Sequence, residues 1–154
     1  GFVNDPTALL DIRLAHGELW VDVLIYTAGL TNPMIAEEAR KQGIGRRHRI
    51  IADSAEPKSI AELVSMGLNV VPSVKGKDSV INGIDILKRY VIHVTRRSVG
   101  LQEEMKNYSW KVLRSGETTN EPVDKWNHAI DALRYVALTY LKSERRSTAR
   151  AQLT

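Results

Sequence analysis

The sequence predicts an α/β fold in which an antiparallel hairpin and later βα units form one central mixed sheet flanked by helices on both faces. Three observations favour this class. Two β-rich runs near the start are joined by a short glycine-containing turn, short apolar runs then alternate with amphipathic segments, and the longest amphipathic segment comes last. A hairpin followed by such alternation is typical of a mixed sheet. The 154 residues, 43% of them hydrophobic, suffice for one domain with a sizeable core.

The first two elements are expected to be the strands of the hairpin. Residues 7–14 alternate loosely between apolar and polar side chains, and residues 18–26 place Leu19, Val21, Val23 and Ile25 on one side. Between them lies Ala15-His16-Gly17, a connection short enough to pair the two runs directly.

The middle of the chain is expected to alternate between helices and short strands. Thr31 or Asn32 can cap a helix that has Pro33 in its first turn and stops at Gly43. The apolar run 49–52 predicts a buried strand that ends at Asp53. The remaining elements expected here are a helix at 56–67, a strand at 69–74, a helix at 79–89 that Asp78 can cap, and a strand at 91–95.

The last third is expected to end in the longest helix. Residues 98–108 are helical or mixed, residues 110–113 are a strand candidate, and residues 115–121 are a polar loop. The final helix is predicted from about Asp124 to Ser143, and the polar residues 144–154 are expected to fray. We therefore expect a single domain over residues 1–143 and a C-terminal tail.

Composition removes several classes of function. Cysteine is absent, which excludes disulfides, thiolate metal sites and cysteine nucleophiles. No apolar run reaches about 18 residues and no leader is visible, so we expect no membrane span and no secretion signal. The net charge of +4 permits a polyanionic partner without requiring one. The motif G-x-x-x-x-G-K-[ST] is missing, so we expect no ATP hydrolysis from these residues.

The last predicted helix carries two carboxylates and an imidazole on one face. Asp124, His128 and Asp131 stand at positions i, i+4 and i+7. Asp53 follows a strand at the edge where open α/β sheets place their sites. Carboxylates from separate elements suit Mg²⁺ or Mn²⁺, and two such ions about 4 Å apart can drive phosphodiester hydrolysis. We therefore predict a metal site of Asp53 and Asp131, with His128 as a ligand or proton shuttle.

Ordinary structural roles stay open for each of these acids. Asp53 can serve as a cap or turn residue, and Asp131 can be solvated surface. Asp124 stands just before the helix and fits an N-cap. Asp5 stands in an Asn-Asp-Pro sequence that is typical of a turn. Asp5 and Asp124 are therefore secondary metal candidates.

Contact with DNA phosphates needs basic side chains near the site. Lys75 and Lys77 lie in a turn at the carboxyl end of a predicted strand, as Asp53 does, and are the first candidates. Arg46 and Arg47 are secondary, because the opposite end of a strand favours a solvated role for them. Nothing resembles a base-reading helix, so any DNA binding should tolerate many sequences. Three residues are expected to be core or packing residues rather than platforms on which bases stack: Trp20, Trp110 and Trp126.

Three ordered segments give the chain a family resemblance. They are Gly1–Leu9, the stretch Ala-Asp-Ser-Ala-Glu-Pro-Lys-Ser-Ile at 52–60, and Asn-His-Ala-Ile-Asp-Ala-Leu-Arg-Tyr at 127–135. In this order and spacing they resemble the C-terminal nuclease domain of tailed-phage large terminase subunits, from Gly1 to about Leu141. The resemblance implies an RNase H-like fold in which acids of two strands and a late helix bind two divalent metals. It assigns Asp53 and Asp131 to two of these acids, with His128 beside them.

The resemblance also implies a function and partners. Members of the family cut concatemeric double-stranded DNA when packaging starts and when the capsid is full. They work in the host cytoplasm with an ATPase motor upstream on the same polypeptide, the capsid portal and the small terminase subunit. The family's first acid would lie just before Gly1, so we expect weak metal binding and little activity from the 154 residues alone.

Two other functions stay open at this point. One is a different RNase H-like nuclease, acting on DNA junctions or RNA–DNA hybrids. The other is a non-catalytic docking module of the packaging machine, which would bind its partner through a surface such as the loop 115–121 and would bind no Mn²⁺ near Asp53.

Overall fold

The computed structural model describes residues 5–142, which divide into two compact units. The first unit comprises the residues up to Leu30 together with Tyr90–Ala132, and the second comprises Thr31–Arg89 and the residues from Leu133 onward. The single domain over residues 1–143 stays a prediction. The predicted tail 144–154 lies outside the described residues.

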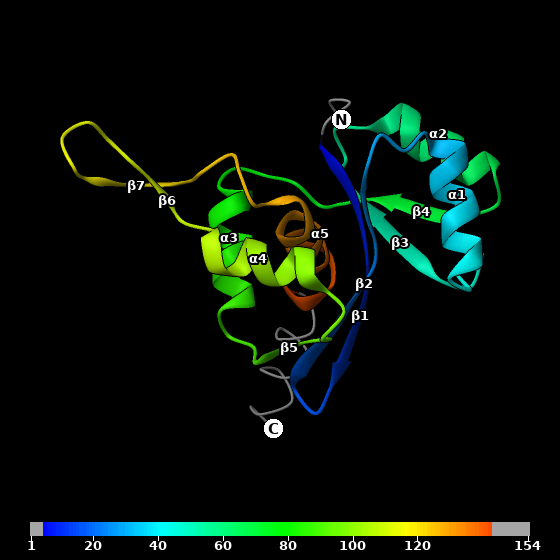
Figure 1. Ribbon diagram of the computed structural model, residues 1–154, viewed down its shortest axis with the longest axis horizontal. Helices are drawn as coiled ribbons and strands as arrows, with labels where there is room; N and C mark the ends of the chain where they lie inside the picture. The colour runs from blue at the N-terminus through cyan, green and yellow to red at the C-terminus, as the bar shows by residue number, and fades with distance from the viewer. Residues whose placement is uncertain (1–4, 143–154) are drawn as a thin grey trace, which may run out of the picture. The chain divides into compact units, whose positions relative to one another are not determined.

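The first unit is built on a mixed three-stranded sheet (Figure 1). Strand β1 (Pro6–Ala15) pairs antiparallel with β2 (Glu18–Ala28), which pairs parallel with β5 (Ile92–Val94). The turn residues His16 and Gly17 both have positive φ, 53° and 76°, as a tight twisted hairpin requires. The predicted hairpin and the mixed pairing are therefore confirmed.

Helix α4 (Val99–Asn107) covers β2 within this unit. The contact is close at Gly100, where an added Cβ would meet ring atoms of Tyr26 at 2.8 Å. The apolar residues buried in the first unit are Leu19, Val21, Ile25, Leu101, Ala129 and Ile130.

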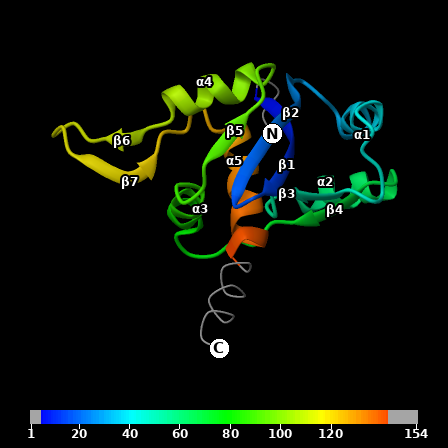
Figure 2. The same cartoon turned by 90° about the horizontal axis from the view of Figure 1, so that it is seen from below.

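A second hairpin extends from the end of α4 (Figures 1 and 2). Strands β6 (Trp110–Val112) and β7 (Thr118–Pro122) pair antiparallel, and Gly116 at φ 86° lies in the reversal between them. The predicted polar loop over residues 115–121 is therefore wrong from Thr118 onward. The polar side chains of β7 show no apolar alternation, so its pairing with β6 left no signal in the sequence.

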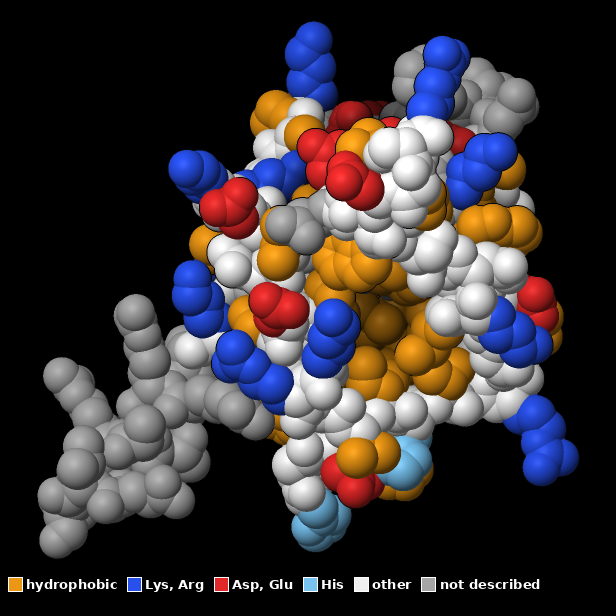
Figure 3. Space-filling view, turned by 90° about the vertical axis from the view of Figure 1, so that its left-hand side faces the viewer, with side chains coloured by type: hydrophobic (Ala, Val, Ile, Leu, Met, Phe, Trp, Pro, Cys, Tyr) orange, Lys and Arg blue, Asp and Glu red, His pale blue; other side chains and the backbone are white. Residues whose placement is uncertain are grey.

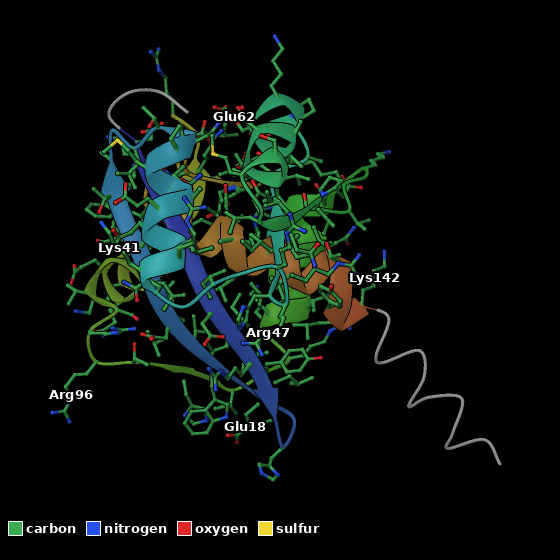
Figure 4. All side chains as sticks on the ribbon, turned by 90° about the vertical axis from the view of Figure 1, so that its right-hand side faces the viewer. Glu18, Lys41, Arg47, Glu62, Arg96 and Lys142 are labelled. Atoms are coloured by element: carbon green, nitrogen blue, oxygen red, sulfur yellow. The ribbon has the colours of Figure 1, made fainter. Side chains whose placement is uncertain are left out.

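The second unit contains a βαβ arrangement. Strands β3 (Arg49–Ala52) and β4 (Asn69–Pro72) run parallel and are joined by α2 (Pro57–Ser65). Helix α1 (Asn32–Lys41) precedes them, and Thr31 caps it by accepting the Met34 N–H at 3.4 Å. The Asn32 amide donates to Glu62 at 2.7 Å, which ties α1 to α2 (Figure 4 labels Glu62). These elements match the predicted ones closely.

Helix α3 (Ser79–Leu87) follows β4 in the sequence. It packs on the helical turn η1 (Ala137–Leu141). Asp78 stands at the predicted cap position, but its backbone is left-handed at φ 59° and its side chain makes no cap bond. The apolar residues buried in the second unit are Ala36, Ala39, Leu68, Val70, Ile86, Leu87, Leu133, Ala137, Leu138 and Leu141.

The last helix begins later than predicted. Helix α5 spans His128–Val136 and continues as the π-helical turn η1. Asp124 lies outside the helix, because the backbone at Trp126 is left-handed with φ 59°. The predicted face that joined Asp124 to His128 and Asp131 is therefore wrong for Asp124. The predicted end at Ser143 lies outside the described residues.

Two of the three tryptophans lie at the surface. Trp20 and Trp126 are each 47% exposed, so neither is a core residue. Trp20 is a packing residue, because it stacks on His93 of the neighbouring strand with ring centroids 3.9 Å apart. Trp110 is half-buried in β6.

Over residues 5–142, none of the helices has the length and apolar character that a membrane crossing requires.

Candidate functional site

The carboxylate of Asp53 collects three donors directly after β3. The Lys75 ammonium forms an ion pair with Oδ1, the Ala55 N–H donates to Oδ1 at 2.9 Å, and the Tyr135 hydroxyl donates to Oδ2 at 3.0 Å. Asp53 and Lys75 meet because parallel β3 and β4 end at the same sheet edge. We call Asp53, Lys75 and Tyr135 the Asp53 cluster.

These donors determine the charge of Asp53. Burial opposes ionisation, but the hydrogen bonds from Lys75, Ala55 and Tyr135 outweigh it and hold the pKa of Asp53 below its ordinary 3.8. The carboxylate is therefore ionised at neutral pH. About a third of its side chain, 34%, remains exposed, so a cation from solvent can reach it.

Helix α5 supplies Tyr135 to the cluster, and the turn η1 supplies a contact beside it. The Lys75 ammonium lies 5.8 Å from the centroid of the Tyr135 ring, within reach of a cation–π contact. Four residues after Tyr135, the Thr139 hydroxyl accepts the Val74 N–H at 3.2 Å. This bond fixes the backbone next to Lys75. Neither Tyr135 nor Thr139 was predicted as a site residue, although both follow Asp131 at helical spacing.

Asp131 and His128 lie in the first turn of α5. Both are half-buried, and the Asp131 N–H bonds the Asn127 carbonyl at 2.6 Å. A carboxylate in a first helical turn is favoured by the helix dipole. Asp131 precedes Tyr135 by four residues of one helix, so the two side chains emerge on the same helical face.

Glu104 anchors the start of that helix and was also missed. Its side chain is fully buried, at 0% exposure. The carboxylate accepts the N–H groups of Ala129 and Ile130, each at 2.9 Å, and the hydroxyl of Tyr26 at 2.8 Å. Burial and this bond to Glu104 raise the pKa of Tyr26 well above its ordinary value. No local sequence pattern predicts that a carboxylate 25 residues upstream accepts the first N–H groups of a helix.

The secondary candidates lie on exposed segments. The Asp124 side chain is 92% exposed, with Lys111 at 3.9 Å, and Asp5 is exposed before β1. Lys77 is exposed in the turn after β4, and Arg46 and Arg47 are exposed between α1 and β3 (Figure 4 labels Arg47). Basic side chains project from the face drawn in Figure 3 among acidic and apolar ones. The metal and DNA roles of these residues stay predictions.

The predicted metal ligands are divided between the units. Asp53 belongs to the second unit, whereas His128 and Asp131 belong to the first. Within residues 5–142, no group of three or more His, Asp or Glu side chains is placed to hold a metal ion. A shared site of Asp53 and Asp131 stays a prediction. Asp53 itself fits a hard divalent cation, because it is ionised, partly exposed and already holds a cationic group.

The family model described as the terminase RNase H-like domain matches residues 1–138. The chain belongs to this family. The match spans every element described above except the last residues of η1. It confirms the resemblance and the RNase H-like α/β fold that the resemblance implied.

Individual relatives agree with the family. The large terminase subunit of Bacillus phage SPP1 is 39% identical over 92 residues, which are 56% of this chain and 22% of that protein. The chain therefore spans about a fifth of the length of this relative. The solved nuclease domain of the SPP1 large terminase, with bound Mn, is 26% identical with a TM-score of 0.78, over 93% of this chain and 82% of that one.

A more distant structure supports the fold alone. The large terminase of a thermophilic bacteriophage is 22% identical with a TM-score of 0.71, and the alignment covers 92% of this chain and 38% of that chain. Membership of the family thus rests on the sequence, and the architecture is shared with solved terminases.

Proposed function

We propose that these residues form the nuclease part of a phage large terminase subunit, which cuts concatemeric DNA at the start and end of packaging by divalent-metal-dependent phosphodiester hydrolysis. The observation that carries the proposal is the family match over residues 1–138, within which the partly exposed Asp53 carboxylate lies at the carboxyl end of β3. The SPP1 nuclease domain, solved with bound Mn, supports the same interpretation.

The leading candidates each have a role in this proposal, and Asp5 and Asp124 stay secondary metal candidates. Asp53 and Asp131 are metal ligands, and His128 is a further ligand or a proton carrier. Mg²⁺ or Mn²⁺, two ions in the complete site, would supply activation of water and stabilisation of the leaving oxygen. Tyr135 orients the Asp53 carboxylate by donating to Oδ2, while the Ala55 N–H fixes Oδ1.

The proposed substrate is double-stranded DNA. Lys75 and Lys77 would contact phosphates, with Arg46 and Arg47 as secondary contacts. Phosphate contacts position a duplex without reading its bases, so the domain should tolerate many sequences.

The proposed partners belong to a longer polypeptide and to the packaging machine. They are an ATPase motor upstream on the same chain, the capsid portal and the small terminase subunit, all in the host cytoplasm. The large terminase of the thermophilic bacteriophage has also been solved in complex with ADP, and this chain covers 40% of that one. That complex supports a nucleotide-binding region elsewhere on such polypeptides.

A cleavage assay tests the proposal. The large terminase polypeptide that carries these residues should cut long duplex DNA with Mn²⁺ or Mg²⁺, and Asp53→Ala or Asp131→Ala should each abolish cutting while the thermal unfolding transition is retained. Asp85→Ala, which removes an exposed carboxylate of α3, is the matched control and should cut normally.

The outcomes separate the alternatives. Retained cutting by both Asp53 and Asp131 variants would remove the site assignment. A preference for four-way junctions or RNA–DNA hybrids over plain duplex would favour a different RNase H-like nuclease. Absence of both cleavage and Mn²⁺ binding would favour a docking module.

A further inference from the structure

The Asp53 cluster holds a positive charge where the proposed function needs a divalent cation. We propose that Lys75 is an internal competitor for that cation: its ammonium occupies Asp53 in the metal-free protein and leaves when Mg²⁺ or Mn²⁺ binds, which frees it for a DNA phosphate. This inference rests on the proposed function and adds an order of events to it.

The geometry sets the two cations in competition at Asp53. Oδ1 already accepts the Ala55 N–H and contacts the Lys75 ammonium, and Oδ2 accepts the Tyr135 hydroxyl. These three contacts leave about one of the four lone-pair positions of a carboxylate for a metal ion. A divalent ion beside an ammonium would also be repelled by it at short range. The ammonium is therefore the group that has to move.

Lys75 is also the member of the cluster that can move. Its side chain is 41% exposed and has a flexible four-carbon stem, whereas Ala55 donates from the backbone. The backbone behind it stays fixed, because Thr139 holds the Val74 N–H. The Tyr135 ring lies 5.8 Å from the ammonium and can make only a weak, non-directional cation–π contact, so it does not fix the ammonium in place.

The released side chain has a use in the proposed reaction. In the turn after β4, a free ammonium would face solvent beside a metal-loaded carboxylate, where a phosphate of the substrate would bind. Metal binding would thereby add one phosphate contact. DNA would be held more tightly by the metal-loaded protein than by the metal-free one.

Mn²⁺ titration of the nucleotide-free large terminase polypeptide that carries these residues, followed by the electron paramagnetic resonance of free Mn²⁺, tests the competition. Lys75→Met should tighten Mn²⁺ binding by about three- to fivefold, the scale of a partly exposed ion pair. Lys58→Met, which removes an exposed lysine of α2 in the same unit, is the matched control and should stay within about 1.5-fold of wild type. Equal affinities of the Lys75 variant and wild type would overturn the inference.

A second readout follows the ammonium itself. In ¹⁵N spectra of lysine side chains, the Lys75 signal of the metal-free protein should be replaced during Mg²⁺ titration, with the same midpoint as metal binding. A Lys75 signal that stays unchanged at saturating Mg²⁺ would overturn the inference, even if the Lys75 variant proved poorly folded.

Asp53→Asn separates this inference from the proposed function. If this variant binds Mn²⁺ as wild type does, the metal site assignment falls and the competition falls with it. If the variant loses Mn²⁺ binding while Lys75→Met and the Mg²⁺ titration show no effect, only the role of Lys75 is overturned.

Discussion

Glu104 and Tyr26 share a hydrogen bond of 2.8 Å in the first unit, and the same carboxylate accepts the first N–H groups of helix α5. A fully buried acid with three donors holds strand β2, helix α4 and helix α5 to one another. Removing it should leave the N–H groups of Ala129 and Ile130 buried without an acceptor, which costs more than an average hydrogen bond contributes.

Glu104→Ala should therefore lower the free energy of unfolding by about 3 kcal/mol. Tyr26→Phe removes one donor and should cost about 1 kcal/mol. Urea unfolding measures both values. Glu103→Ala, at an exposed neighbouring position, should change stability by less than about 0.5 kcal/mol. A comparable loss in the Glu103 variant would count against the anchoring role of Glu104.

Gly100→Ala should destabilise the protein although it adds a better helix former. The new Cβ would lie 2.8 Å from the Tyr26 ring, and such overpacking costs about 1–3 kcal/mol against a helix gain of at most about 1 kcal/mol. Thermal unfolding should therefore show a lower transition temperature. Gly45→Ala is the control, because nothing lies within 4 Å of its Cβ position and its backbone is not left-handed. A Gly100 variant that is more stable than wild type would mean that the Tyr26 ring moves aside without a cost in stability.

Stability should fall in acid through Asp22. The Arg97 guanidinium, together with Thr95 and Ser98 and against the opposing effect of burial, lowers the pKa of Asp22 from 3.8 to about 2. A carboxyl with a depressed folded-state pKa contributes stability above its unfolded pKa and loses it as pH falls through the folded pKa. The free energy of unfolding should therefore drop between about pH 4 and pH 2.

Urea unfolding at pH 6, 4, 3 and 2 would measure this contribution, with pH values chosen around those pKa values. Asp22→Asn should be less stable than wild type at pH 6, and the difference should shrink toward pH 2. A difference that stays constant across this range would refute the assignment to Asp22.

His16→Asn should stabilise the first hairpin. His16 is held at φ 53° before Gly17, a left-handed turn position at which hairpins prefer asparagine. The expected gain is about 0.5 kcal/mol in the free energy of unfolding. Gly17→Ala, at φ 76°, should act in the opposite direction and cost about 1 kcal/mol. Equal stability of the His16 variant and wild type would contradict the prediction, because it would mean that asparagine has no advantage over histidine in this turn.

The regular elements were predictable because their signals are local. Thr31, Pro33 and Gly43 mark the ends of α1 through cap chemistry, and the apolar run 49–52 marks β3. The placement of Asp53 and Lys75 at one sheet edge followed from the same parallel-strand argument.

The rest depended on contacts between residues distant in sequence. The first residue of α5 is set by Glu104, and strand β7 is set by pairing with β6 rather than by its own polar residues. Tyr135 was expected as part of a helix and of the segment 127–135 but not as a site residue, although its hydroxyl reaches Asp53 across 82 positions of sequence. Helical spacing after Asp131 was the one signal that could have singled it out.

The π-helical turn at Ala137–Leu141 makes the number of residues in the last helix important for the structure. Such a turn closes i→i+5 bonds and holds about one residue more than an α-helical turn. Inserting a further residue at the start of this turn would exceed what the turn holds and rotate everything beyond it by about 100°. Thr139 would then lose its register with Val74, while Tyr135, which precedes the turn, would keep its own. Chain length in this stretch is thus itself a structural constraint.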